Sequence, residues 1–102
     1  MINVIATITL NPGVRQQFLA VFNANIPAVL EEDGCIEYFP AIDVDAGIEI
    51  QVRNPDTVVV IEKWSSVEAL HAHLVAPHMQ TYKEQVKDLV ASLSLKVLEN
   101  AN

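Results

Sequence analysis

The sequence predicts an α+β domain in which a mostly antiparallel sheet carries its helices on one face. The chain has 102 residues, about the length of one domain, and 51% of them are hydrophobic, which is enough for a core. Apolar residues alternate with polar ones near the C-terminus and recur with period two at the N-terminus. In two internal stretches the apolar residues instead recur at helical spacing. We therefore expect one domain over residues 1–102.

The first third of the chain predicts a strand followed by a long helix. Residues Ile2–Leu10 are mostly apolar and β-branched on both faces, as in a strand covered on both sides. The sequence Asn11-Pro12-Gly13 then predicts a turn, and residues 14–30 carry apolar side chains at helical spacing. Pro27 is expected to kink or break this helix, and Gly34 to stop it.

The middle of the chain predicts three strands. Residues 35–42 form the first, in which Pro40 favours an edge or a strand end. Residues 48–53 alternate apolar and polar side chains, which predicts a second, half-buried strand. The third strand is Thr57–Trp64, and its unbroken apolar run from Val58 to Ile61 predicts a central position buried on both faces.

Two helices and a last strand are expected after Trp64. Ser65 and Glu68 have the spacing of a capping box that opens the first helix. Pro77 fits the first turn of a second helix, running to about residue 90. Leucine and valine alternate with polar residues from 92 to 97, which predicts a closing strand. The inward stripe of the second helix is expected to contain Met79, Tyr82, Val86 and Leu89.

This order of elements is a ferredoxin-like plan with one extra strand. Both helical segments would cover one face of the sheet and leave the other bare. Because the Thr57–Trp64 strand is apolar on both sides, we expect a second copy of the same sheet to cover that bare face.

Composition excludes several classes of function. The formal net charge of −7 disfavours binding to nucleic acid or anionic lipid. No apolar run approaches the roughly 18 residues of a membrane span. The N-terminus lacks the basic region and the cleavage site of a secretory signal, so we expect a cytoplasmic protein. Cys35 is the sole cysteine and has no disulfide partner within the chain. Glycine-rich phosphate loops are missing, which argues against nucleotide cofactors.

The three histidines, His71, His73 and His78, are the densest chemical signal. A metal site is disfavoured because His71 and His73 point to nearly opposite sides of a helix and Pro77 interrupts the register before His78. We expect His71 to be exposed. His73 and His78 are candidates for acid–base work at a pocket mouth, although a structural role is equally consistent with their spacing.

Trp64 and Glu62 share one face of a predicted strand. Trp64 either completes the core or stacks on a flat ligand, and Glu62 either forms a structural pair or orients an imidazole. The run from Glu31 to Asp33 resembles a solvated acidic surface.

Several segments together resemble the antibiotic biosynthesis monooxygenase domain, and within it the small quinol monooxygenase-like proteins. They are the opening strand with Asn11-Pro12-Gly13, residues 31–38 (EEDGCIEY), residues 62–65 (EKWS) and residues 69–82 (ALHAHLVAPHMQTY). The resemblance covers nearly the whole chain and is more specific for the domain than for any one reaction.

The resemblance implies a homodimeric α+β barrel made by sheet-to-sheet packing, with a pocket between sheet and helices. It also implies oxidation of a hydroquinone or related electron-rich phenol by molecular oxygen, with no cofactor and no metal. The residues carried over are His73 and His78 as catalytic candidates, and Trp64, Glu62 and Tyr82 as substrate-binding candidates.

Two alternatives stay open. One is a noncatalytic dimeric protein that binds a small aromatic ligand or acts in a stress response, since the same pocket residues suit simple recognition. The other is a haem-degrading monooxygenase. The haem-degrading relatives resemble one another in an inward-facing asparagine on the first strand, where this chain has Ala6. This difference argues against haem degradation.

Overall fold

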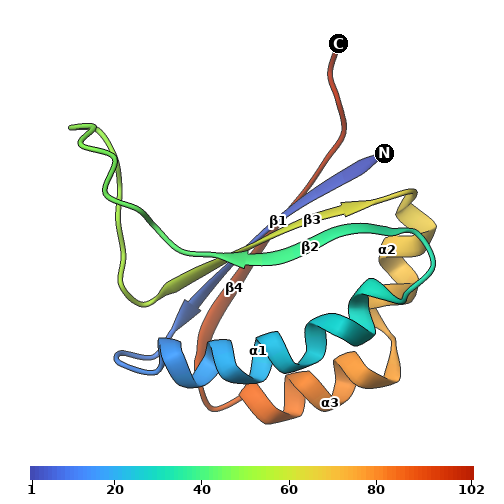
Figure 1. The fold of residues 1–102 in the computed structure, drawn as a ribbon, viewed down its shortest axis with the longest axis horizontal. Helices are drawn as coiled ribbons and strands as arrows, with labels where there is room; N and C mark the ends of the chain where they lie inside the picture. Colours follow the sequence, from blue (N-terminus) through green and yellow to red (C-terminus); the bar gives the residue numbers. More distant parts are fainter.

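The protein has two layers, a four-stranded sheet and three helices that all lie on one side of it (Figure 1). The computed structural model describes all of residues 1–102. This arrangement confirms the predicted α+β, ferredoxin-like fold. In chain order the elements are β1 (Ile2–Leu10), α1 (Arg15–Leu30), β2 (Cys35–Ala41), β3 (Thr57–Trp64), α2 (Val67–Leu74), α3 (Pro77–Val86) and β4 (Val90–Leu98).

The sheet is antiparallel throughout, with the strand order β2-β3-β1-β4. β3 lies inside the sheet, as its apolar run predicts, and β2 and β4 form the two edges. Ala6 of β1 pairs with Val60 of β3 on one side and with Leu95 of β4 on the other. Directly paired residues point to the same face, so this register brings one row of side chains from three strands toward the helices.

The core lies between the sheet and the helices. The even-numbered residues of β1 from Val4 onward, and those of β3, are buried beneath the helices, including Val58 and Val60. Their odd-numbered neighbours Val59 and Ile61 are only half-buried on the opposite face. Within one chain, β3 is therefore fully buried only on the face that packs against the helices, and not on both faces as expected.

α1 runs through Pro27 without a break, contrary to the expected interruption. Proline costs a helix one hydrogen bond, but Phe22 and Val29 on either side are buried in the core, and their packing holds the last turn in place. The helix ends at Leu30, before Gly34. Gly34 has a left-handed φ of +84° and turns the chain into β2 instead.

The second and third helices begin close to where the sequence places them. Ser66, one residue after the expected cap, accepts a hydrogen bond of 3.1 Å from the Ala69 amide at the start of α2. Ser65 instead donates its amide to the Gly34 carbonyl at 2.8 Å. A side chain at Gly34 would collide with Ser65 and Ala69, so glycine permits this close approach of β2 and α2. Pro77 occupies the first turn of α3.

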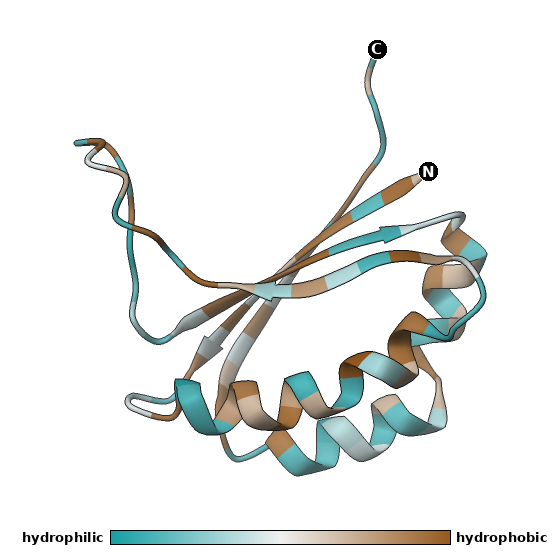
Figure 2. Cartoon of the chain, in the orientation of Figure 1, coloured by the Kyte–Doolittle hydropathy of each residue, from teal (hydrophilic) through white to brown (hydrophobic).

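The predicted strand at residues 48–53 is wrong. Residues 42–56 form a loop that projects from the end of β2 and β3 (Figure 1), and no strand pairs with it. Ile50 and Val52 are 90% and 86% exposed, although Figure 2 shows hydrophobic residues along this segment. Alternation alone cannot make a strand, because the backbone groups need a neighbouring strand.

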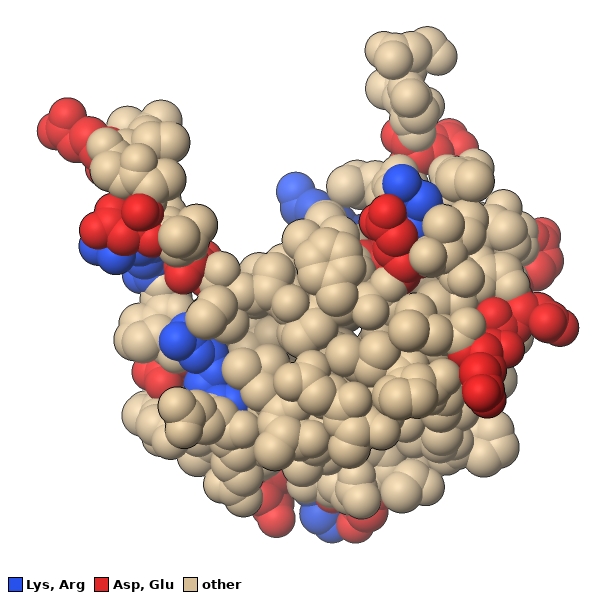
Figure 3. All heavy atoms as spheres, in the orientation of Figure 1, with Lys and Arg blue, Asp and Glu red and all other residues tan.

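Short-range polar contacts shape this loop instead. The Asp43 carboxylate accepts from the Asn54 amide at 2.7 Å, and Arg53 lies 3.5 Å from Asp45. Figure 3 shows these acidic and basic side chains gathered on the projection, beside a broad uncharged area on the body of the molecule. None of the three helices combines the length and apolar character needed to cross a lipid bilayer.

Candidate active site

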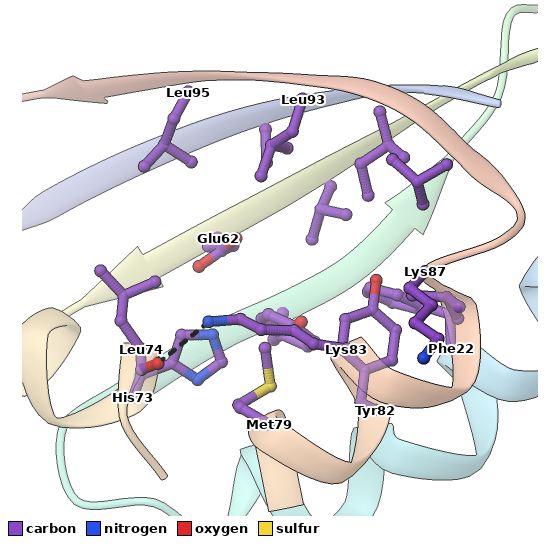
Figure 4. A pocket seen from close by; sticks show the side chains of 16 residues that line it. Phe22, Glu62, His73, Leu74, Met79, Tyr82, Lys83, Lys87, Leu93 and Leu95 are labelled. Atoms are coloured by element: carbon purple, nitrogen blue, oxygen red, sulfur yellow. Dashed lines mark hydrogen bonds between the residues drawn. The ribbon is translucent and has the colours of Figure 1, made fainter.

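A cavity of about 260 Å³ lies between the helix-side face of the sheet and helix α3. All four strands and all three helices contribute to its wall, and 12 of the 16 lining residues are hydrophobic. The polar exceptions include Glu62 from β3 and His73 from α2, which enter the cavity from facing walls (Figure 4). An apolar pocket with a few convergent polar groups is the usual form of a small-molecule site.

His73 is the imidazole that reaches the cavity. Its side chain is 2% exposed, and its Nδ1 lies 2.9 Å from Oε2 of Glu32. A carboxylate accepts hydrogen bonds, so this contact places the ring proton on Nδ1 and leaves the lone pair on Nε2. Burial lowers the pKa of His73 below its ordinary value, and Glu32 opposes part of that effect. His73 is therefore held neutral, in the tautomer that can accept a proton at Nε2.

His78 contacts the same carboxylate from the start of α3 but does not line the cavity. Its Nε2 lies 3.1 Å from Glu32 Oε2, in an orientation that makes no hydrogen bond, and both ring nitrogens are shielded from solvent. Glu32 thus joins the loop after α1 to α2 through His73 and to α3 through His78. Of the two catalytic candidates, only His73 opens on the cavity.

Glu62 and Trp64 form a buried pair on β3. The Trp64 indole N–H donates to Glu62 Oε1 at 2.9 Å. Burial raises the pKa of Glu62 to about 7, while this hydrogen bond acts in the opposite direction and the charge of Glu32 adds to the rise. A carboxyl group with this pKa is present in both protonation states near neutral pH and can either donate or accept a proton.

Trp64 is part of the hydrophobic core. It is completely buried, lies outside the cavity lining, and packs against His73 with ring centroids 4.7 Å apart. The core takes up the whole indole, and the stacking of Trp64 on a substrate ring stays a prediction. Glu62 orients no imidazole, since its hydrogen-bond partner is Trp64.

Two tyrosines bring hydroxyl groups to the cavity lining. Tyr82 of α3, one of the predicted substrate-binding residues, lines the cavity, and so does Tyr38 of β2. Burial raises the pKa of both hydroxyls, with a further contribution from the charge of Glu62. Both hydroxyls thus stay protonated and can donate hydrogen bonds. His71 is exposed on α2, as expected.

Comparisons with known proteins identify the family of this chain. The family model described as "Antibiotic biosynthesis monooxygenase" matches residues 1–85. The chain belongs to the antibiotic biosynthesis monooxygenase family. It is 43% identical over 101 residues to YgiN of Escherichia coli K12, which is named a "Probable quinol monooxygenase", and the match covers 97% of each protein.

Solved structures support the fold of this antibiotic biosynthesis monooxygenase domain. A Mycobacterium tuberculosis protein superposes with a TM-score of 0.79 at 27% identity, covering 99% of this chain and 95% of its own. A Pseudomonas aeruginosa protein reaches 0.82 at 22% identity, covering 99% and 94%. The family and the curated relative support a monooxygenase.

Glu32 is the residue that sequence reasoning missed. Its place in an acidic run predicts a solvated surface, yet its side chain is only 15% exposed and contacts two histidines. The prediction failed because the partner residues lie about 40 positions away and only the fold brings them together. The one available signal was the neighbouring Gly34, whose close approach to α2 brings this segment beside the histidines.

The structure contains neither a cluster of metal-ligating side chains nor an activated thiol. No group of three or more His, Cys, Asp or Glu side chains is arranged to hold a metal ion. Cys35 is half-buried, and burial together with the charges of Glu32 and Glu62 raises the pKa of its thiol. This disfavours a reactive thiolate. Ala6 lies on the inward face of β1 and lines the cavity.

Proposed function

We propose that this protein oxidises a hydroquinone or related electron-rich phenol with molecular oxygen, without a prosthetic group. The observation that carries the proposal is the buried His73–Glu32 pair, whose free Nε2 opens on an apolar cavity. The volume of about 260 Å³ lies near the lower end of ligand pockets, roughly 300–1,000 Å³, and so suits a small aromatic ring. The family match and the named relative point to the same reaction class.

His73 supplies the base in this proposal. A hydroquinone is barely ionised at neutral pH, and transfer of its hydroxyl proton to Nε2 gives a phenolate that yields an electron to oxygen more readily. The resulting semiquinone and superoxide combine at a ring carbon that bears hydrogen, and the proton on His73 returns to form a hydroperoxide. Glu32 holds the Nδ1 proton throughout and so keeps Nε2 directed at the substrate.

The reaction balances without an external reductant. The hydroperoxide loses water as the ring C–H bond breaks, and the product is a hydroxyquinone. One oxygen atom enters the ring and the other leaves as water, while the hydroquinone supplies all four electrons. Glu62, in its protonated form, donates to the oxygen that leaves. Tyr82 donates a hydrogen bond to a substrate oxygen, and Trp64 positions Glu62 through the indole N–H.

Single histidine substitutions test the assignment. We expect His73→Ala to lower oxygen uptake with a hydroquinone by roughly 10²–10⁴-fold, the range of a positioned acid–base group. His78→Ala should have a smaller effect, because His78 acts only through Glu32. His71→Ala, on the exposed side of the same helix as His73, is the matched control and should retain full activity.

Two results would overturn the proposal. Equal rates for the parent protein and a folded His73→Ala variant would remove His73 as the base. Oxygen uptake that never exceeds autoxidation with any hydroquinone tried, combined with saturable binding of the same compounds, would favour the noncatalytic binding protein instead.

We also propose that the working form is a homodimer made by sheet-to-sheet packing. Support comes from the uncovered face of the sheet, where Val59 and Ile61 stay half-buried and Phe39 is 43% exposed. Obligate interfaces of this kind bury on the order of 2,000 Å² or more, so the dimer should persist at micromolar concentration. Light scattering that finds a folded monomer there would refute it.

A further inference from the structure

The charges around the cavity are opposite to those of the chain as a whole. The sequence has 13 acidic and 6 basic residues. Only one of the acidic residues, Glu62, lines the cavity, whereas two of the basic ones, Lys83 and Lys87, do so. A protein with a strong acidic excess has therefore placed a third of its basic side chains at one mostly apolar pocket.

Lys83 is an exposed residue of the cavity lining. Its side chain extends from α3 toward α2, where Nζ donates to the Leu74 carbonyl at 3.3 Å (Figure 4). No carboxylate lies within ion-pair distance of Lys83. An ammonium group has three donors, and the carbonyl takes one of them. Lys83 thus brings an uncompensated positive charge with free donors to the cavity.

The positive charge of Lys87, unlike that of Lys83, has a carboxylate beside it. The Lys87 Nζ lies 2.6 Å from Glu84, but both side chains are more than half exposed, and exposed pairs of this kind contribute little. Lys83 also acts on the catalytic histidine, because its charge adds to the lowering of the His73 pKa. The positive field of Lys83 therefore reaches the region where the substrate ring would lie.

We propose that the substrate of this site is an aromatic ring that carries a carboxylate, and that Lys83 binds this carboxylate with Lys87 as a second, outer cation. The inference rests on the proposed function and specifies its substrate class. A neutral hydroquinone would form no ion pair with Lys83, whereas a carboxylate would accept a charge-assisted hydrogen bond from it. The ring itself would lie in the apolar part of the cavity, between Glu62 and His73.

Binding measured without oxygen tests this proposal. The probes are 2,5-dihydroxybenzoate and 2,5-dihydroxybenzamide, which share a ring and differ in one charge, titrated anaerobically by calorimetry. The parent protein should bind the carboxylate roughly tenfold more tightly than the amide, about the value of one charge-assisted hydrogen bond. Added salt should narrow the difference.

The Lys83→Gln variant should lose that preference and leave amide binding within about twofold of the parent protein. Lys83→Arg keeps the charge and should keep the preference. Arg53→Gln is the control, because it removes one positive charge from the exposed loop at residues 42–56, outside the cavity lining. Lys83 is exposed, so these substitutions should leave the fold intact, which circular dichroism would verify.

Equal affinity of the parent protein for the two probes, or no binding of either, would overturn the proposal. An equal loss of both probes in Lys83→Gln would also overturn it. Because the titration needs no turnover, it separates the two proposals. A preference for the carboxylate probe without oxygen uptake would support the anion site and contradict the monooxygenase. Oxygen uptake with neutral hydroquinones alone would support the monooxygenase and contradict the anion site.

Discussion

Strand β3, with its unbroken apolar run, and the loop at residues 42–56, with its alternating residues 48–53, both have strand-like sequences but opposite environments. In β3, Val58 and Val60 are buried beneath the helices, between two paired strands. In the loop, Ile50 and Val52 stand almost fully exposed. The contrast shows that alternation makes a segment suited to a sheet, and that neighbouring strands and a covering layer decide whether it enters one.

Acidic side chains are buried in β3 but exposed to solvent in the loop. Glu62 is buried on β3 with one indole donor, so its pKa rises to about 7. Asp43 and Asp45 in the loop stay in solvent, where they accept from backbone amides of their own segment. A carboxylate becomes a proton donor near neutral pH only where the fold removes water from it.

Removing the largest side chain behind the cavity should have the greatest effect on stability. Trp64→Ala should lower the free energy of unfolding by about 3–5 kcal/mol, because a fully buried indole is deleted and Glu62 loses its donor. Urea denaturation followed by circular dichroism would measure it. Trp64→Phe fills much of the space without the N–H and should cost less. A loss below about 1 kcal/mol for alanine would mean that this side of the sheet packs loosely.

Glu62→Gln should change how stability depends on pH. The unfolded carboxyl ionises near pH 4.5 and the folded one near pH 7, so between these values the folded protein holds more protons than the unfolded chain. Stability of the parent protein should therefore fall as pH rises from 4.5 to 7, by about 3 kcal/mol in total.

Glutamine cannot ionise, so the variant should lack this fall and exceed the parent protein in stability at pH 8. Unfolding measured at pH 5 and pH 8 would test it. Glu37→Gln, on the exposed side of β2, is the control and should keep the parent pH profile. The same profile in Glu62→Gln would show that the Glu62 carboxyl is not desolvated.

Polar substitution in the loop should have the smallest effect. Ile50→Ser and Val52→Ser remove apolar groups that contact solvent, so each should change the free energy of unfolding by no more than about 0.5 kcal/mol. Thermal unfolding at two protein concentrations would measure the change. A larger loss that depends on concentration would contradict it and would assign the loop to an interface between copies.

Local pattern was sufficient for most of the fold. Apolar periodicity located β1, β3 and the inward side of α3, because side chains alternate in a strand and repeat every 3.6 residues in a helix. Proline chemistry located the start of α3 at Pro77, since a missing amide hydrogen costs nothing in a first turn. Charge and glycine content, likewise properties of the sequence alone, argued against nucleic-acid partners and nucleotide cofactors.

Three of the residues predicted for the site line the cavity. These are His73, Glu62 and Tyr82, and their residue types predicted acid–base and hydrogen-bonding roles. The sequence could not distinguish His73 from His78. That distinction depends on which ring opens on the cavity, and a proline-separated pair of short helices fixes their relative directions only when both pack on the sheet.

Tertiary structure alone decided the partners of each group. Glu32 reaches His73 across about 40 residues, and Trp64 turns inward to hold Glu62. It also decided that residues 48–53 stay outside the sheet. Sequence records which contacts a residue can make, but burial, hydrogen-bond partners and shifted pKa values depend on neighbours that only the folded chain brings within reach.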